Sequence, residues 1–156
     1  MTRAEKFIRI VLLSEGGSKY TNDPKDAGGE TKYGISKKAF PNVDIKNLTE
    51  SDAIDIYKKM YYDPCKCDLF NDELLALHVF DFGVNAGIGR AIKTLQSVIG
   101  VKADGIIGKQ TIEKVNSKDY VKLYSDARKA FYYSIGVGSN KKFIKGWINR
   151  VNNLKV

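Results

Sequence analysis

A glutamate at the end of a predicted helix is the first residue whose position suits acid catalysis. Glu15 closes a stretch, residues 3–15, whose apolar side chains share one helical face, and Gly16 and Gly17 follow at once. The negative end of a helix dipole disfavours a charged carboxylate, which favours the protonated form that a general acid needs. The two glycines let a bulky substrate approach the backbone. A plain surface glutamate at a helix end fits the same pattern.

The loop after this helix adds further polar groups. It contains Asp23, Asp26 and the hydroxyl of Thr31. Glycoside hydrolysis needs one acid that protonates the leaving oxygen and a second group that stabilises charge or holds a water. Asp23, within Asn-Asp-Pro, is equally typical of a turn, and Asp26 is equally consistent with a solvated surface residue. The spacing is not that of an EF-hand loop, so we expect no metal and no cofactor.

The elements that must position these groups are predicted to be helices separated by glycines. Thr49, with Asp52 three residues later, predicts a helix start, and Pro64 predicts its end. Further apolar runs at helical spacing predict helices that open near residues 71, 91, 111, 117 and 143. No helical period survives in residues 18–35, where the turn residues allow a small β-hairpin. The fold class is therefore mainly α, with about seven helices.

Length and composition exclude several classes of protein. The chain has 156 residues, of which 43% are hydrophobic and 28% charged, as expected for one globular domain. No apolar run approaches the ~18 residues of a membrane span. The amino-terminal residues alternate charged and apolar types, so we expect synthesis in the cytoplasm without a signal peptide. Cys65 and Cys67 are too close for an unstrained disulfide, and we expect free thiols.

Positive charge is concentrated in the second half of the chain. Residues 88–156 carry 14 Lys and Arg against 4 Asp and Glu, a net +10, whereas residues 1–87 are net −2. Such a balance indicates a polyanionic partner, namely nucleic acid, a membrane face or an anionic cell-wall polymer. A solvated basic surface without a specific partner is the alternative. No nucleic-acid-binding motif is present, so we do not expect nucleic acid to be the partner.

Several motifs together resemble glycoside hydrolase family 108. They are Glu-Gly-Gly at 15–17, Tyr-Thr-Asn-Asp-Pro-Lys-Asp-Ala-Gly-Gly-Glu-Thr at 20–31, and Gly-Ile at 34–35. Phe-Asp-Phe-Gly-Val-Asn-Ala-Gly at 80–87 and Asp-Gly-Ile-Ile-Gly-Lys-Gln-Thr at 104–111 resemble the peptidoglycan-associated module that follows in this family. The likeness covers most of residues 5–115. Ser18-Lys19 and Cys67 depart from the usual pattern of the loops.

The resemblance implies a lysozyme-like fold and a peptidoglycan hydrolase of phage-endolysin type. The implied activity is that of an N-acetylmuramidase, which cleaves the β-1,4 bond between N-acetylmuramic acid and N-acetylglucosamine. The family's catalytic acid corresponds to Glu15. Asp23 or Asp26, with Thr31, are then candidates for the second role, and the resemblance does not choose between the aspartates. We expect one domain, residues 1–156, with a catalytic lobe at 1–70 and a peptidoglycan-associated lobe at 71–156.

Candidate substrate contacts come from aromatic and polar side chains. Tyr20 and Tyr33 lie in or beside the catalytic loop, and an aromatic face suits a pyranose ring. Asp81 and Asn85 lie four residues apart on one helical face, where they line a cleft or cap local backbone. His78, the only histidine, lies on the same apolar helix, and we interpret it as a satisfied core residue rather than a catalyst.

The expected partners follow from this interpretation. They are the glycan strands of peptidoglycan and a holin-type pore that lets the enzyme reach the wall, with the protein itself a monomer. Three alternatives remain: a muramidase that remodels the wall for protein secretion, a non-catalytic wall-binding protein, and a nucleic-acid binder that uses the basic second half.

Overall fold

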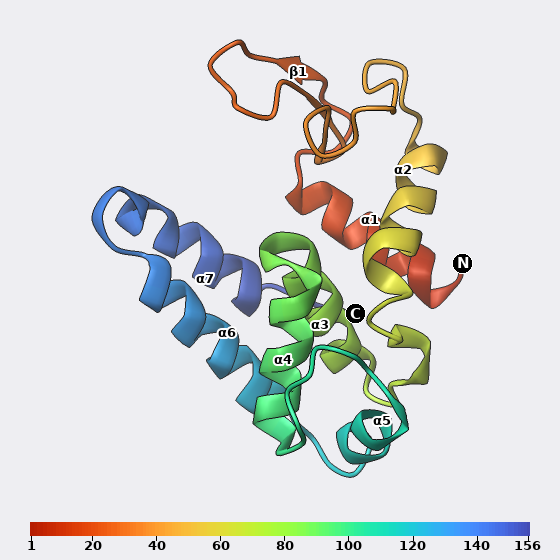
Figure 1. Ribbon diagram of the computed structural model, residues 1–156, viewed down its shortest axis with the longest axis vertical. Coiled ribbons are helices and arrows are strands. Elements are labelled where there is room, and N and C mark those ends of the chain that lie inside the picture. The colour runs from red at the N-terminus through yellow and green to blue at the C-terminus, as the bar shows by residue number, and fades with distance from the viewer. The chain divides into compact units, whose positions relative to one another are not determined.

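The computed structural model describes residues 1–156, which form two compact units, Met1–Met60 and Tyr61–Val156. It contains seven α-helices and one small antiparallel sheet, so the predicted mainly α, lysozyme-like class is confirmed (Figure 1). The expected single domain, with a lobe boundary at residue 70, stays a prediction. None of the helices combines the length and the apolar character needed to cross a membrane.

The first unit opens with α1 (Arg3–Ser14), which buries one apolar face. Its start is a reciprocal cap: the Thr2 hydroxyl accepts from the Glu5 backbone N–H at 3.1 Å, and the Glu5 carboxylate accepts from the Thr2 N–H at 2.9 Å. The helix ends at Glu15, where Gly16 and Gly17 take positive φ angles of 91° and 59°. The predicted glycine stop is thus confirmed.

The loop after α1 folds into three short antiparallel strands in the order β1-β2-β3. They are β1 (Thr21–Asn22), β2 (Glu30–Lys32) and β3 (Ile35–Ser36). Tyr33 and Gly34 make the two-residue turn between β2 and β3, with φ angles of 55° and 74°. Two positive φ angles in succession define a type I′ turn, whose twist matches that of paired strands. The sequence predicted one hairpin, and the structure adds a second.

The second helix, α2 (Glu50–Tyr57), begins as predicted. The Thr49 hydroxyl accepts from the Asp52 N–H at 3.1 Å, and the Asp52 carboxylate accepts from the Thr49 N–H at 3.2 Å. Beyond Tyr57 the chain widens into a π-helical turn, η1 (Lys58–Tyr62), before Pro64. Tyr57, at the end of the α-helical part, is buried.

The second unit is built around one buried helix. Its elements are η2 (Cys67–Leu69), α3 (Glu73–Ala86), α4 (Ile88–Ile99), α5 (Lys109–Val115), α6 (Val121–Ile135), η3 (Gly138–Phe143) and α7 (Ile144–Asn152). Every residue of α3 from Leu75 to Gly83 is buried, as its nearly uniform apolar sequence predicted. Helix α3 packs against α4 and α6, and α6 forms an antiparallel pair with α7 (Figure 1).

Several helices begin a few residues from the predicted positions: α4 begins at Ile88 rather than near 91, and α6 at Val121 rather than near 117. Helix α3 begins close to residue 71, where Asp72 caps it, since its carboxylate accepts from the Leu75 N–H at 3.1 Å. Ser117 does not cap α6, because its hydroxyl donates to the Lys114 carbonyl at the end of α5 at 2.6 Å. The carboxylate of Asp119 instead accepts from the first N–H of α6.

Both cysteines of the second unit are free thiols, as predicted, and both are fully buried. Lys66, between them, has a left-handed φ of 53°. The thiol of Cys67 donates a weak hydrogen bond to the Ala76 carbonyl oxygen, 3.8 Å away. Their environment is that of small core residues rather than of reactive thiols.

Candidate active site

Glu15 lies directly against the β2–β3 turn. Its backbone N–H donates to the carbonyls of Val11 and Leu12, so the residue is fixed to the last turn of α1, and its side chain is half-buried. A Cβ atom added at Gly34 would stand only 2.7 Å from the Glu15 Cβ and 3.2 Å from its Cγ. Real Cβ atoms do not approach this closely, so only glycine allows the turn to rest on the glutamate stem.

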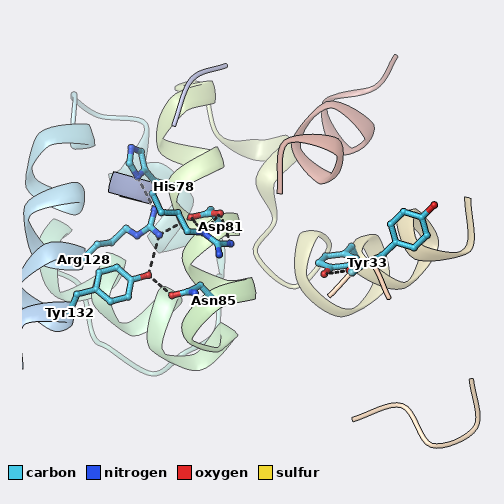
Figure 2. Close-up of polar contacts among 8 residues, drawn as sticks. Tyr33, His78, Asp81, Asn85, Arg128 and Tyr132 are labelled. Atoms are coloured by element: carbon cyan, nitrogen blue, oxygen red, sulfur yellow. Dashed lines mark hydrogen bonds and ion pairs between the residues drawn. The ribbon is translucent and has the colours of Figure 1, made fainter. Parts of the chain in front are cut away.

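Two further hydrogen bonds hold the turn in place. The Tyr33 N–H donates to the Gly17 carbonyl at 3.1 Å, which joins the turn to the segment after Glu15. From α2, the Tyr57 hydroxyl donates to the Tyr33 carbonyl at 2.7 Å (Figure 2). The same hydroxyl would lie 2.5 Å from a Cβ at Gly34. The end of α1, the turn and the end of α2 therefore meet at one point and position Glu15 together.

A pocket of about 310 Å³ opens beside this junction. Tyr33, a predicted substrate contact, lines it, and Arg9 and Glu50 form an ion pair at its wall. The full lining is Arg9, Leu12, Leu13, Gly17, Ser18, Tyr33 and Glu50. One aromatic ring, two leucines and several hydrogen-bonding groups are the mixture that a sugar ring requires. A larger pocket of about 590 Å³ lies on α4 and contains none of the predicted site residues.

The candidate second groups lie on the loop and the sheet of the same unit. Asp23 and Asp26 are exposed, and one carboxylate oxygen of each accepts a backbone N–H two residues later, from Lys25 and Gly28, both at 2.9 Å. Both aspartates therefore form turns, while the other oxygen of each makes no hydrogen bond within the protein. Thr31 is half-buried in the middle strand, and its hydroxyl also makes no hydrogen bond within the protein.

Tyr20, the other predicted aromatic contact, uses its hydroxyl within the protein. The hydroxyl donates to the Glu30 carboxylate at 2.7 Å, and this hydrogen bond raises the pKa of Tyr20 above its usual value. The ring of Tyr20 and the acceptor side of its hydroxyl are therefore available to a sugar.

Asp81 does not occupy the position that the sequence predicted for a substrate contact. Its side chain is fully buried in the second unit, and its two oxygens accept from Arg128 of α6 at 2.7 Å and from Arg150 of α7 at 2.9 Å (Figure 2). Arg150 adds a second bond through Nε at 3.0 Å. The carboxylate is thus saturated by two guanidinium groups, and it ties α3 to α6 and α7.

The neighbours of Asp81 complete a polar cluster inside the second unit. Asn85, exposed and also predicted to contact substrate, accepts a hydrogen bond from the Tyr132 hydroxyl. His78 is buried, as predicted for a core residue, and its Nδ1 lies 3.0 Å from Arg128 Nη1. Because arginine only donates, Nδ1 accepts and the imidazole is neutral. Burial, together with the charge of Arg128, lowers the pKa of His78 from 6.5 to about 4.

Sequence reasoning missed the residues that support Glu15. The Gly-Ile motif at 34–35 does not indicate that Gly34 contacts Glu15, because Tyr-Gly is not a dipeptide typical of two-residue hairpin turns. No local pattern links Tyr57 to this turn. Arg9 and Glu50, which lie 41 residues apart in the chain, have no local pattern that could link them.

Comparison with known proteins identifies the family of the chain. The profile of the family described as glycosyl hydrolase 108 matches residues 8–87, and that of a predicted peptidoglycan domain matches residues 90–152. The structure of Brucella abortus SagA superposes with a TM-score of 0.79 and 33% sequence identity, over 96% of this chain and 89% of that chain. Curated protein sequences gave no match.

The first match contains Glu15, the β2–β3 turn and Tyr57, and the second contains most of α4 and all of α5, α6 and α7. A glycoside hydrolase that acts on peptidoglycan is the class that these findings define. The chain belongs to glycosyl hydrolase family 108.

Proposed function

We propose that this peptidoglycan hydrolase is an N-acetylmuramidase with lysozyme activity and that Glu15 is its general acid. The bond cleaved is the β-1,4 linkage between N-acetylmuramic acid and N-acetylglucosamine. The supporting observation is the fixed position of Glu15, which Gly34 and Tyr57 hold at the end of α1 beside the pocket lined by Tyr33. A catalytic acid must be held within hydrogen-bond reach of the oxygen that it protonates.

In the proposed reaction the Glu15 carboxyl group donates its proton to the glycosidic oxygen as the bond to the anomeric carbon breaks. Positive charge then develops on the sugar ring, as in other glycosidases. A carboxylate from Asp23 or Asp26 stabilises this charge, or activates the water that attacks the anomeric carbon and accepts its proton. The Thr31 hydroxyl, which makes no bond within the protein, orients that water.

Product analysis by mass spectrometry tests this proposal. Purified peptidoglycan is digested with the wild-type protein and, in parallel, with Glu15→Gln. Fragments that end in reducing N-acetylmuramic acid, absent from the Glu15→Gln digest, are the expected result. Anhydro-muramic ends would assign the protein to lytic transglycosylases instead, and intact glycan would leave only wall binding.

The lytic role is a separate proposal, based on the likeness to phage-type endolysins. We propose that the enzyme is made in the cytoplasm and degrades the cell wall after a holin-type pore gives it access. Production of the protein in bacteria should then leave cells intact until such a pore is co-expressed, and Glu15→Gln should abolish lysis. A wall-remodelling role in secretion would instead predict no lysis even with the pore open.

A further inference from the structure

The turn that joins α6 to α7 exposes apolar and basic side chains together. Val137 is 66% exposed and Phe143 47% exposed, although both are large apolar residues. Lys141, Lys142 and Lys145 are exposed beside them, and none of the three forms an ion pair. We call these five residues the hairpin tip. In Figure 1 the tip lies at the end of the α6–α7 pair that is farther from α5.

The exposure of Phe143 is built into the fold. Its ring centroid lies 5.7 Å from that of Trp147, which in turn stacks on Tyr132 at 5.3 Å. Gly136 closes the base of the hairpin, because a Cβ there would stand 2.3 Å from Ile144 Cγ1. The chain is therefore packed directly beneath the tip, while Val137 and Phe143 stay exposed.

The electrostatic environment of the hairpin tip is uniformly positive. No Asp or Glu occurs in residues 127–156, which contain seven Lys and Arg. Asp81 forms ion pairs with Arg128 and Arg150, and the remaining five lysines form no ion pair. The Lys142 ammonium group lies 5.2 Å from the Phe143 ring centroid, so a basic group borders the apolar side chain directly.

We propose that the hairpin tip binds the surface of an anionic phospholipid bilayer, with Val137 and Phe143 inserted among the lipids and the three lysines at the headgroups. An anionic glycan would satisfy the lysines and offer a sugar face to the Phe143 ring, but it would leave Val137 exposed. A bilayer satisfies the lysines and both apolar side chains, since apolar burial and attraction to anionic lipids act together in interfacial binding. This inference is independent of the chemistry proposed for Glu15.

Trp147 provides a direct readout, because it is the only tryptophan in the chain and it contacts Phe143. The wild-type protein is titrated with phosphatidylcholine vesicles that either contain or lack phosphatidylglycerol. We expect a blue shift of the tryptophan emission, and co-sedimentation, only with the anionic vesicles. Lack of binding to the anionic vesicles would refute the proposal.

Two pairs of variants separate insertion from general attraction. Val137→Ser with Phe143→Ser removes the apolar groups and should weaken vesicle binding at least about tenfold. Ile106→Ser with Leu123→Ser is the matched control, because these residues of the same unit are 72% and 51% exposed and lie outside the tip. The control pair should retain wild-type binding to within about twofold. An equal loss in both pairs would contradict a specific role of the tip.

The basic residues are tested in the same way. Changing Lys141, Lys142 and Lys145 to Gln should abolish the preference for anionic vesicles. The same change at Lys102, Lys114 and Lys118, which are exposed elsewhere in the unit, removes equal charge and should have a smaller effect. Binding to purified cell-wall sacculi is measured in parallel. If the tip variants lose sacculus binding and keep vesicle binding, the partner is the wall polymer and the proposal fails.

Discussion

Gly34 and Glu15 are in such close contact that no side chain fits between them. A Cβ at position 34 would lie 2.7 Å from the Glu15 Cβ, and the φ of 74° is itself a left-handed angle. The β2–β3 turn thus restricts where the side chain of Glu15, the proposed acid, can lie.

Gly34→Ala should displace Glu15 and lower turnover at least about tenfold, because small misplacements of a catalytic group are costly. Gly29→Ala is the matched control: its φ is 70°, but nothing lies within 4 Å of its added Cβ. Both variants should lose about 1 kcal/mol of stability through the left-handed angle, and Gly34→Ala should lose more because its Cβ clashes with Glu15 and Tyr57. Urea unfolding and turbidity of a peptidoglycan suspension measure the two effects. Equal activities of the two variants would show that the contact with Glu15 is unimportant.

Glu15→Gln preserves the size of the side chain and removes the acidic proton. Because a positioned general acid contributes roughly 10²–10⁴-fold, we expect wall degradation to fall by at least about 100-fold. Glu113→Gln, at an exposed position of the second unit, should behave as wild type. If Glu15→Gln retains more than about a tenth of the activity, another residue is the acid.

Asparagine substitutions separate charge from turn formation at the two aspartates. Asn keeps the side-chain oxygen that accepts the N–H of Lys25 or Gly28, so the loop should keep its shape. We expect Asp23→Asn or Asp26→Asn to lower turnover about tenfold or more, whichever carboxylate assists Glu15, and Thr31→Ala to lower it if the hydroxyl orients the water. Wild-type rates in all three variants would leave the second role to a different residue.

Asp81→Asn should destabilise the fold rather than the chemistry. The change leaves two guanidinium groups without their counter-charge, and one of them, Arg128, is fully buried. Removal of one partner from a buried ion pair costs about 3–5 kcal/mol. Asp126→Asn is the control, since its pair with Lys122 is exposed to solvent and should contribute little to stability. Similar urea midpoints for the two variants would contradict this role.

The depressed pKa of His78 predicts a loss of stability in acid. Its value is about 4 in the folded protein and 6.5 in the unfolded chain, so the unfolded chain binds the proton more readily between these values. Stability should therefore fall as the pH is lowered from about 6.5 to 4, by on the order of 3 kcal/mol. His78→Gln, which can still accept from Arg128, should lack this component. A slope that persists unchanged in the variant would assign it to other groups.

The sequence was most informative where structure depends on neighbouring residues. The glycines after Glu15 and the Thr49–Asp52 cap were predictable, because a helix end depends on a few adjacent residues. Thr2, with Glu5 three residues later, carries the same local signal of a helix start.

Contacts between distant parts of the chain were not predictable. Asp81 pairs with Arg128 and Arg150, which are 47 and 69 residues away, so its position on a helix indicated neither of these ion pairs. Tyr33 takes a positive φ, which non-glycine residues rarely adopt, and this hid the second hairpin from sequence reasoning.

The two buried thiols make the second unit chemically distinguishable from the first. Cys65 and Cys67 are the only cysteines, and both belong to Tyr61–Val156. A thiol without exposed surface reacts with an alkylating reagent only when its surroundings open transiently. The labelling rate of the intact protein therefore reports any opening that exposes Cys65 and Cys67 in Tyr61–Val156, and it does not detect openings confined to Met1–Met60.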